Sequence, residues 1–94
     1  MTSISMESFK NIHEKNPVSL IDVRPEALYQ ENHIPGAVNI SLEELENRLA
    51  ELSPTDAHYI VCQRGVKSEV ATALLTEKGF DATNVEGGTL AWKI

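Results

Sequence analysis

Short apolar stretches with the composition of β-strands alternate along this chain with stretches whose apolar residues recur at helical spacing. Proline and glycine punctuate the boundaries between them. This order is typical of βαβ units, in which helices connect parallel strands. It predicts an α/β fold with a mainly parallel sheet and helices on both faces. The expected strands lie at 18–22, 37–40, 58–61 and 83–85, and the expected helical segments at 6–15, 25–29, 42–53, 68–78 and 89–92.

Length and composition place the chain among small globular proteins. Its 94 residues fit one domain spanning residues 1–94. No stretch approaches the roughly 20 apolar residues of a membrane span, and the first ten residues lack the features of a secretory signal. The net charge of −6 disfavours nucleic-acid binding, and one cysteine allows no internal disulfide. We therefore expect a water-soluble, cytoplasmic protein without nucleic-acid or membrane partners.

Two of the expected helices begin at capping signals. Ser5 is a plausible N-cap for the helix at 6–15. Ser41-Leu-Glu-Glu44 resembles a capping box, in which a serine and an acidic side chain satisfy each other's backbone N–H groups. The helix that it opens is expected to end by Pro54, and it places four leucines on one face: Leu42, Leu45, Leu49 and Leu52.

Cys62 lies in the turn between the strand at 58–61 and the helix that follows it. Gly65 stands three residues later, so the segment Cys62–Ser68 is a glycine-containing loop that leads into a helix N-terminus. Backbone N–H groups in such a loop form a cradle for anions. The helix dipole, Arg64 and Lys67 are all expected to favour the thiolate form of the cysteine. The pattern therefore predicts a depressed pKa for Cys62.

Several polar residues are expected to meet at one edge of the sheet. Ligands of open α/β sheets bind beyond the carboxyl ends of the strands, where Asp22, Cys62 and the segment Glu86–Gly88 all lie. Three of the eight basic residues belong to segments near this edge: Arg24, Arg64 and Lys67. Together they could form a local positive funnel on an acidic protein, so the expected substrate is a small anion.

Each of these residues also has a purely structural interpretation. A cysteine after an apolar strand can be a small buried hydrophobe, and Arg64 and Lys67 can be solvated surface charges. Asp22 and Arg24 can pair with each other or cap a helix, which is the interpretation that we favour for them. His33 is expected to fix its loop through hydrogen bonds. The other histidines, His13 and His58, support neither a Cys-His dyad nor a metal site.

Four segments of the chain stand out as a set: Asp22-Val-Arg24, His33-Ile-Pro-Gly-Ala-Val-Asn-Ile40, Cys62-x-x-Gly65-x-Lys67-Ser68 and Glu86-Gly-Gly-x-x-Ala-Trp92. In this order and spacing they resemble the signatures of the rhodanese homology domain, over nearly the whole chain. The resemblance implies a five-stranded parallel sheet flanked by helices. It also implies a sulfurtransferase whose nucleophile is Cys62.

In such an enzyme the cysteine thiolate attacks the outer sulfur of thiosulfate, sulfite leaves, and a persulfide remains. Cyanide, a thiol or a protein then accepts the sulfur. The resemblance implies no cofactor and no metal, and it gives Asp22 and Arg24 a supporting role. It assigns substrate binding to the loop residues Gln63, Arg64, Gly65, Val66, Lys67 and Ser68.

The sequence departs from the family pattern at three positions. Lys67 stands where arginine is common, Asn32 where glycine often precedes the histidine, and Ser41 where proline is frequent. Lysine keeps the charge of arginine but lacks its bidentate fork, so the grip on an oxyanion could be weaker and the preferred donor could differ. The chain also ends at Trp92-Lys-Ile94, which suggests a trimmed domain or a fragment.

Two rival functions remain open. The small size and early end favour a sulfur-relay or binding module that does not use thiosulfate and works with a cysteine desulfurase or a fused redox partner. A phosphatase is disfavoured, because the loop from Cys62 to Lys67 holds six residues, as in sulfurtransferases. The related dual-specificity phosphatases and arsenate reductases have a loop that is longer by one residue.

Overall fold

The centre of the computed structural model, which describes residues 2–92, is a parallel sheet of five strands. The strands run in the order β1-β5-β4-β2-β3, so β4 is central and β1 and β3 are short edges. Their bounds are β1 Ser3–Ile4, β2 Ser19–Asp22, β3 Val38–Asn39, β4 Ala57–Val61 and β5 Asp81–Val85. The expected α/β fold with a mainly parallel sheet is confirmed.

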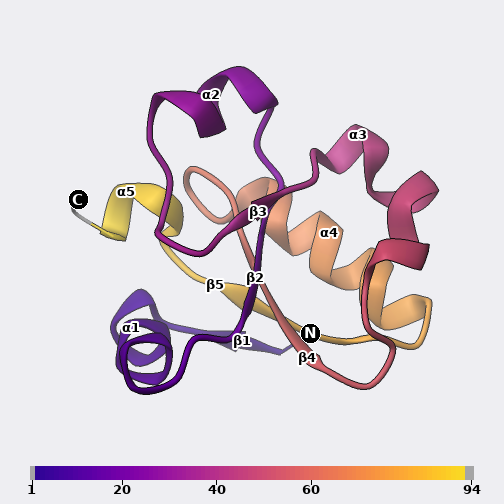
Figure 1. The fold of residues 1–94 in the computed structure, drawn as a ribbon, viewed down its shortest axis with the longest axis horizontal. Coiled ribbons are helices and arrows are strands. Elements are labelled where there is room, and N and C mark those ends of the chain that lie inside the picture. The colour runs from indigo at the N-terminus through magenta and orange to yellow at the C-terminus, as the bar shows by residue number, and fades with distance from the viewer. Residues whose placement is uncertain (1, 93–94) are drawn as a thin grey trace.

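The helices cover both faces of this sheet (Figure 1). One face carries α3 and α4, and the other carries α1 and α5, while α2 lies near the ends of the strands (Figure 1). Their bounds are α1 Met6–Lys15, α2 Glu26–Glu31, α3 Leu42–Leu45, the 3₁₀ helix η1 Glu46–Glu51, α4 Val66–Glu77 and α5 Gly88–Trp92.

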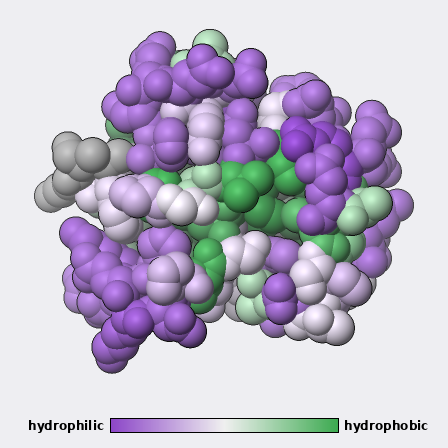
Figure 2. Space-filling view, in the orientation of Figure 1, coloured by the Kyte–Doolittle hydropathy of each residue, from purple (hydrophilic) through white to green (hydrophobic). Residues whose placement is uncertain are grey.

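Each face of the sheet has its own apolar core, because side chains alternate between the faces along a strand. On the α1 side, Phe9 and Leu20 are buried with Val61. On the α4 side, Ile21 and Ile60 pack with Leu75 of α4, and Cys62 belongs to the same cluster. Successive residues of β4 therefore belong to opposite cores. On the surface, Figure 2 shows hydrophobic residues across the middle of the view, between polar residues of α1 and α2.

One of the two capping predictions is correct and the other is wrong. The Ser5 hydroxyl accepts a hydrogen bond from the Ser8 N–H at 3.1 Å, as expected for an N-cap. The Ser41 hydroxyl instead donates to the carboxylate of Glu44 at 3.2 Å and caps no backbone group. The expected single helix also breaks: α3 ends at Leu45, and Arg48 within η1 has non-helical angles. The tighter 3₁₀ turn still directs the later leucines of this stretch, Leu49 and Leu52, against the core.

The sequence patterns missed the edge strand β1. The two residues of β1 are too short to show periodicity. This strand exists because the Glu86 N–H donates to the carbonyl of Ile4 and the Asn84 N–H donates to that of Thr2.

Two expectations concern the surroundings and the end of the chain. Within residues 2–92, no helix is long and apolar enough to cross a membrane. The early end that suggested a trimmed domain falls at Lys93 and Ile94, which lie outside the described residues.

Candidate active site

The loop after β4 turns back on itself to meet the first turn of α4. Cys62 follows the last residue of the strand, and Gly65 is the N-cap of α4 with a φ of +97°. A residue with a side chain is strained at such an angle, so glycine lets the loop close in this way. Space is not the constraint here, because a Cβ at this position would lie at an ordinary contact distance of 3.4 Å from the backbone nitrogen of Gly87.

The closed loop directs hydrogen-bond donors at the sulfur of Cys62. The Gly65 N–H donates to Sγ at 3.0 Å, and the Ser68 N–H donates to it at 3.3 Å. The Ser68 hydroxyl also lies 3.3 Å from Sγ, and it can donate when the sulfur is ionised. Cys62 is only 3% exposed, yet its sulfur is surrounded by donors. This environment differs from that of an ordinary core cysteine.

The balance of these effects lowers the pKa of Cys62. Burial alone raises the pKa, because it penalises the charged form. The Ser68 hydroxyl and the backbone N–H groups of Ser68, Gly65 and Arg64 outweigh burial, so the net shift is downward. The direction agrees with the prediction from sequence. The cause differs, because hydrogen bonds to the loop take the place of the expected charges of Arg64 and Lys67.

The segment Glu86–Trp92 packs directly against this loop. The Thr89 N–H donates to the carbonyl of Cys62 at 2.8 Å, and the Leu90 N–H donates to that of Gln63 at 3.2 Å. A Cβ on Gly88 would collide with both of these carbonyl oxygens. The backbone of the C-terminal segment therefore holds the start of the loop, which gives a physical reason for glycine at position 88.

Asp22 and Arg24 form a buried ion pair at the end of β2. The guanidinium donates to the two carboxylate oxygens over 2.8–3.1 Å, and both side chains are buried. Its Nη2 also donates to the carbonyl of Asn32 at 2.7 Å, while the Asn39 amide donates to the carbonyls of Asp22 and Arg24. The pairing favoured from sequence is confirmed. Through Asn32, the C-cap of α2, the pair ties the end of that helix to the strand beside the cysteine.

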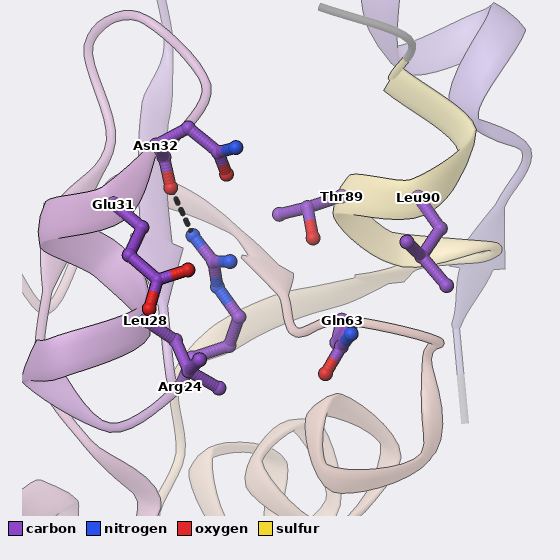
Figure 3. Close-up of a pocket in the computed structure, with 7 residues that line it drawn as sticks. All are labelled: Arg24, Leu28, Glu31, Asn32, Gln63, Thr89 and Leu90. Atoms are coloured by element: carbon purple, nitrogen blue, oxygen red, sulfur yellow. Dashed lines mark hydrogen bonds between the residues drawn. The ribbon is translucent and has the colours of Figure 1, made fainter.

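A pocket of about 280 Å³ lies between α2 and the start of α5 (Figure 3). Its wall includes Gln63, next to Cys62, and Thr89, whose N–H holds the cysteine carbonyl. The pocket therefore adjoins the loop. The complete lining is Arg24, Leu28, Glu31, Asn32, Gln63, Thr89 and Leu90.

The expected positive funnel is not formed. Arg64 is exposed and does not line the pocket, and the Lys67 ammonium lies 4.0 Å from the carboxylate of Glu43. The loop turns its N–H groups inward, which leaves these two side chains outside. Arg24 does reach the pocket, but Asp22 neutralises its charge.

The three histidines are engaged away from the cysteine. The His33 Nδ1 lies 2.9 Å from the carbonyl of Tyr29, which confirms its role in fixing the loop. His13 contacts the carbonyl of Pro35, and His58 contacts Ser19. In the part of the chain that the structure describes, none of them forms a hydrogen bond with Cys62.

Fold and site together define a class of protein: α/β domains that hold a cysteine in a backbone anion cradle at the carboxyl edge of the sheet. The pattern of the rhodanese-like domain matches residues 5–94, and the chain belongs to that family. A solved rhodanese-like domain protein from Staphylococcus aureus has the same fold, with a TM-score of 0.92 and 36% identity. The alignment covers 98% of this chain and 91% of that one.

Two curated relatives illustrate the range of the family. A putative sulfur carrier protein of Bacillus subtilis is 38% identical over 91 residues, which cover 95% of this chain but 49% of that protein. A thiosulfate sulfurtransferase of Pseudoalteromonas translucida is 32% identical over 91 residues, which cover 96% of this chain and 87% of that one. The chain thus spans about half of the first relative and most of the second. Both relatives are named for the handling of sulfur, which makes sulfur transfer the general activity of the group.

Proposed function

We propose that this protein is a sulfurtransferase that carries sulfur as a persulfide on Cys62. It takes the sulfur from thiosulfate or a similar donor and passes it to a thiophilic acceptor. The observation that supports this proposal is the set of donors around Sγ, from Gly65 and from both polar groups of Ser68. They lower the pKa of the thiol, which increases the fraction of the protein that carries the nucleophilic thiolate.

The loading step needs no redox partner. The Cys62 thiolate attacks the outer sulfur of thiosulfate, and a new sulfur–sulfur bond forms. The original sulfur–sulfur bond of thiosulfate breaks, and its electron pair leaves with sulfite. The thiolate anion of Cys62 thus becomes a persulfide anion, and the loop N–H groups stabilise the negative charge before and after the step. Because no proton must be removed from a nucleophilic thiolate, the step needs no general base.

The substrate-binding role of the loop is part of the proposal. Its backbone, from Gln63 to Ser68, supplies the N–H groups that hold the anionic sulfur. The exposed side chains of Val66 and Lys67 face outward and are available to a partner, not to the sulfur. Asp22 and Arg24 support the loop from the neighbouring strand through their buried pair. A reducing compartment such as the cytoplasm suits this scheme, because it keeps Cys62 as a thiol.

The test is the intact mass of the reduced protein before and after treatment with thiosulfate, with Cys62→Ser as the control. We expect the addition of one sulfur atom, its removal by cyanide, and no addition in the variant. If thiosulfate leaves the protein unmodified, loading is attempted with a persulfidated cysteine desulfurase. Loading by that protein alone would contradict the proposal of a thiosulfate-using enzyme. It would instead favour a relay module, in line with the relative that is named a putative sulfur carrier.

A further inference from the structure

The pocket beside the loop contains a buried cation with an unused donor. Arg24 is only 5% exposed, and its Nε and Nη2 donate to Asp22 and to the carbonyl of Asn32. Its other terminal nitrogen, Nη1, has no hydrogen-bond acceptor among residues 2–92. Figure 3 shows the guanidinium turned toward the space between α2 and Thr89. This donor is not among the buried polar atoms left without a partner, so water reaches it in the pocket, and an oxygen acceptor of a ligand can take the place of that water.

The same pocket contains a carboxylate whose charge is not compensated. Glu31, the last residue of α2, turns its carboxylate to the side on which Arg24 lies (Figure 3). Among the described residues Glu31 forms no ion pair, and the charge of Arg24 is already cancelled by Asp22. The pocket therefore carries the formal charge of Glu31. A cationic amino group would be attracted by this charge.

We propose that this pocket binds the small thiol that receives the sulfur, and that it selects thiols carrying a positively charged amino group. The amino group pairs with Glu31, and a carboxylate or carbonyl oxygen on the same molecule accepts a hydrogen bond from Arg24 Nη1. The exposed side chain of Leu90 and the half-buried Leu28 supply apolar contact for the carbon chain. This inference rests on the Cys62 persulfide of the proposed function and names its acceptor class.

The pocket is lined by Gln63, the residue after Cys62, so a thiol bound there lies next to the loop that carries the persulfide. The acceptor thiolate attacks the outer sulfur of the Cys62 persulfide, and a bond forms between these two atoms. The bond from the outer sulfur to Sγ breaks, and its electron pair returns to Cys62 as the thiolate. Before the attack, the persulfide anion takes one proton from solvent, and this proton stays on the outer sulfur, while the acceptor thiol has lost its own proton to solvent. Because the cradle stabilises the thiolate, Cys62 is a good leaving group.

The experiment compares two matched pairs of acceptors on protein that is already loaded. Cysteamine and β-mercaptoethanol differ by an amino group in place of a hydroxyl, and cysteine and β-mercaptopropionate differ by one amino group. Inorganic polysulfide loads Cys62, and intact mass confirms the loading. The rate of sulfur transfer to each thiol is then measured for the wild type and for Glu31→Gln. The quantity compared is, for each thiol, the ratio of the rate with the wild type to the rate with the variant. The thiol's own reactivity cancels from this ratio.

We expect Glu31→Gln to slow transfer to cysteamine and cysteine by about two- to fivefold, the range of a partly exposed ion pair. Transfer to the two thiols without an amino group should be unchanged or faster. Glu26→Gln, which removes an exposed carboxylate from the first turn of the same helix outside the pocket, is the control and should change no ratio. Glu31→Lys should shift the preference further, toward β-mercaptopropionate.

The result that overturns this inference is an equal effect of Glu31→Gln on thiols with and without an amino group. That result would leave the proposed function intact, because Cys62 would still carry sulfur. A Cys62 that accepts sulfur from polysulfide but not from thiosulfate would overturn the proposed donor and leave the acceptor pocket to be judged by the ratios. A Cys62 that accepts sulfur from neither would overturn both proposals.

Discussion

The hydroxyl of Ser68 offers a direct way to test why the pKa of Cys62 is low. Ser68→Ala removes this hydroxyl, which lies 3.3 Å from Sγ, and keeps the backbone N–H that also donates to the sulfur. The thiolate loses one donor while the neutral thiol loses only a weak partner. The pKa of Cys62 must therefore rise. Alanine fits the position, because Ser68 is buried within the first turn of a helix and alanine is a strong helix former.

The size of the shift follows from the strength of one hydrogen bond to a charged group. Such bonds contribute about 1.5–3 kcal/mol, and the lower end applies here because sulfur is a weaker acceptor than oxygen. Since one pKa unit corresponds to about 1.36 kcal/mol, we expect an increase of about one unit. The rate of alkylation by iodoacetamide, measured from pH 5 to 10 by intact mass, reports the midpoint of thiolate formation.

The matched control is Thr72→Val on the next turn of α4. The Thr72 hydroxyl donates to the carbonyl of Ser68 at 2.7 Å and is not a partner of Sγ. This variant removes a buried hydroxyl of the same helix without touching the sulfur, so its midpoint should stay at the wild-type pH. A midpoint in Ser68→Ala that stays in place or falls would show that the hydroxyl does not stabilise the thiolate.

Three further predictions concern stability. Gly88→Ala should destabilise the fold more than Gly79→Ala, as measured by urea unfolding. Both glycines have a positive φ, at which an alanine costs about 1–3 kcal/mol, but of the two only at Gly88 would the added Cβ also collide with backbone atoms. Equal losses would refute the collision. Asp22→Asn should cost about 3–5 kcal/mol because it leaves the Arg24 charge buried without its partner, and a loss below about 1 kcal/mol would contradict this. The third prediction compares the free energy of unfolding of the wild type with that of Cys62→Ser at several pH values. The difference should grow in favour of the wild type as the pH rises through the lowered pKa of folded Cys62, and it should level off at about pH 8.5, where the thiol of the unfolded chain also ionises, at its ordinary pKa. A pH-independent difference would argue against a folded-state thiolate.

Sequence patterns predicted the order of strands and helices and the loop that holds the cysteine. They succeeded because these features are local: β4 is an apolar run, and the positive φ of Gly65 is marked by the residue type itself. The break at Arg48 was not predicted, because the four leucines around it fit one helical face equally well. The strand β1 was missed because long-range pairing alone defines it.

The composition of the pocket could not be predicted for a different reason. Arg64 and Lys67 lie close to Cys62 in sequence, but the direction of a side chain in a loop depends on backbone angles that composition does not reveal. Glu31 is far from the cysteine in sequence and reaches the pocket because the Asp22–Arg24 pair fixes α2 near the loop. The sequence contains no periodicity that would place this carboxylate there.

The contact between Thr89 and the carbonyl of Cys62 also orders events during synthesis. When the cysteine emerges from the ribosome, the segment that will hold its loop is still inside the exit tunnel, so the cradle stays open until the strand β5 and α5 follow. In that interval the thiol lacks its full set of contacts and is accessible to oxidants. Residues 1–94 contain one cysteine, so no second thiol within them can form an internal disulfide. Damage at this stage would therefore come from outside these residues.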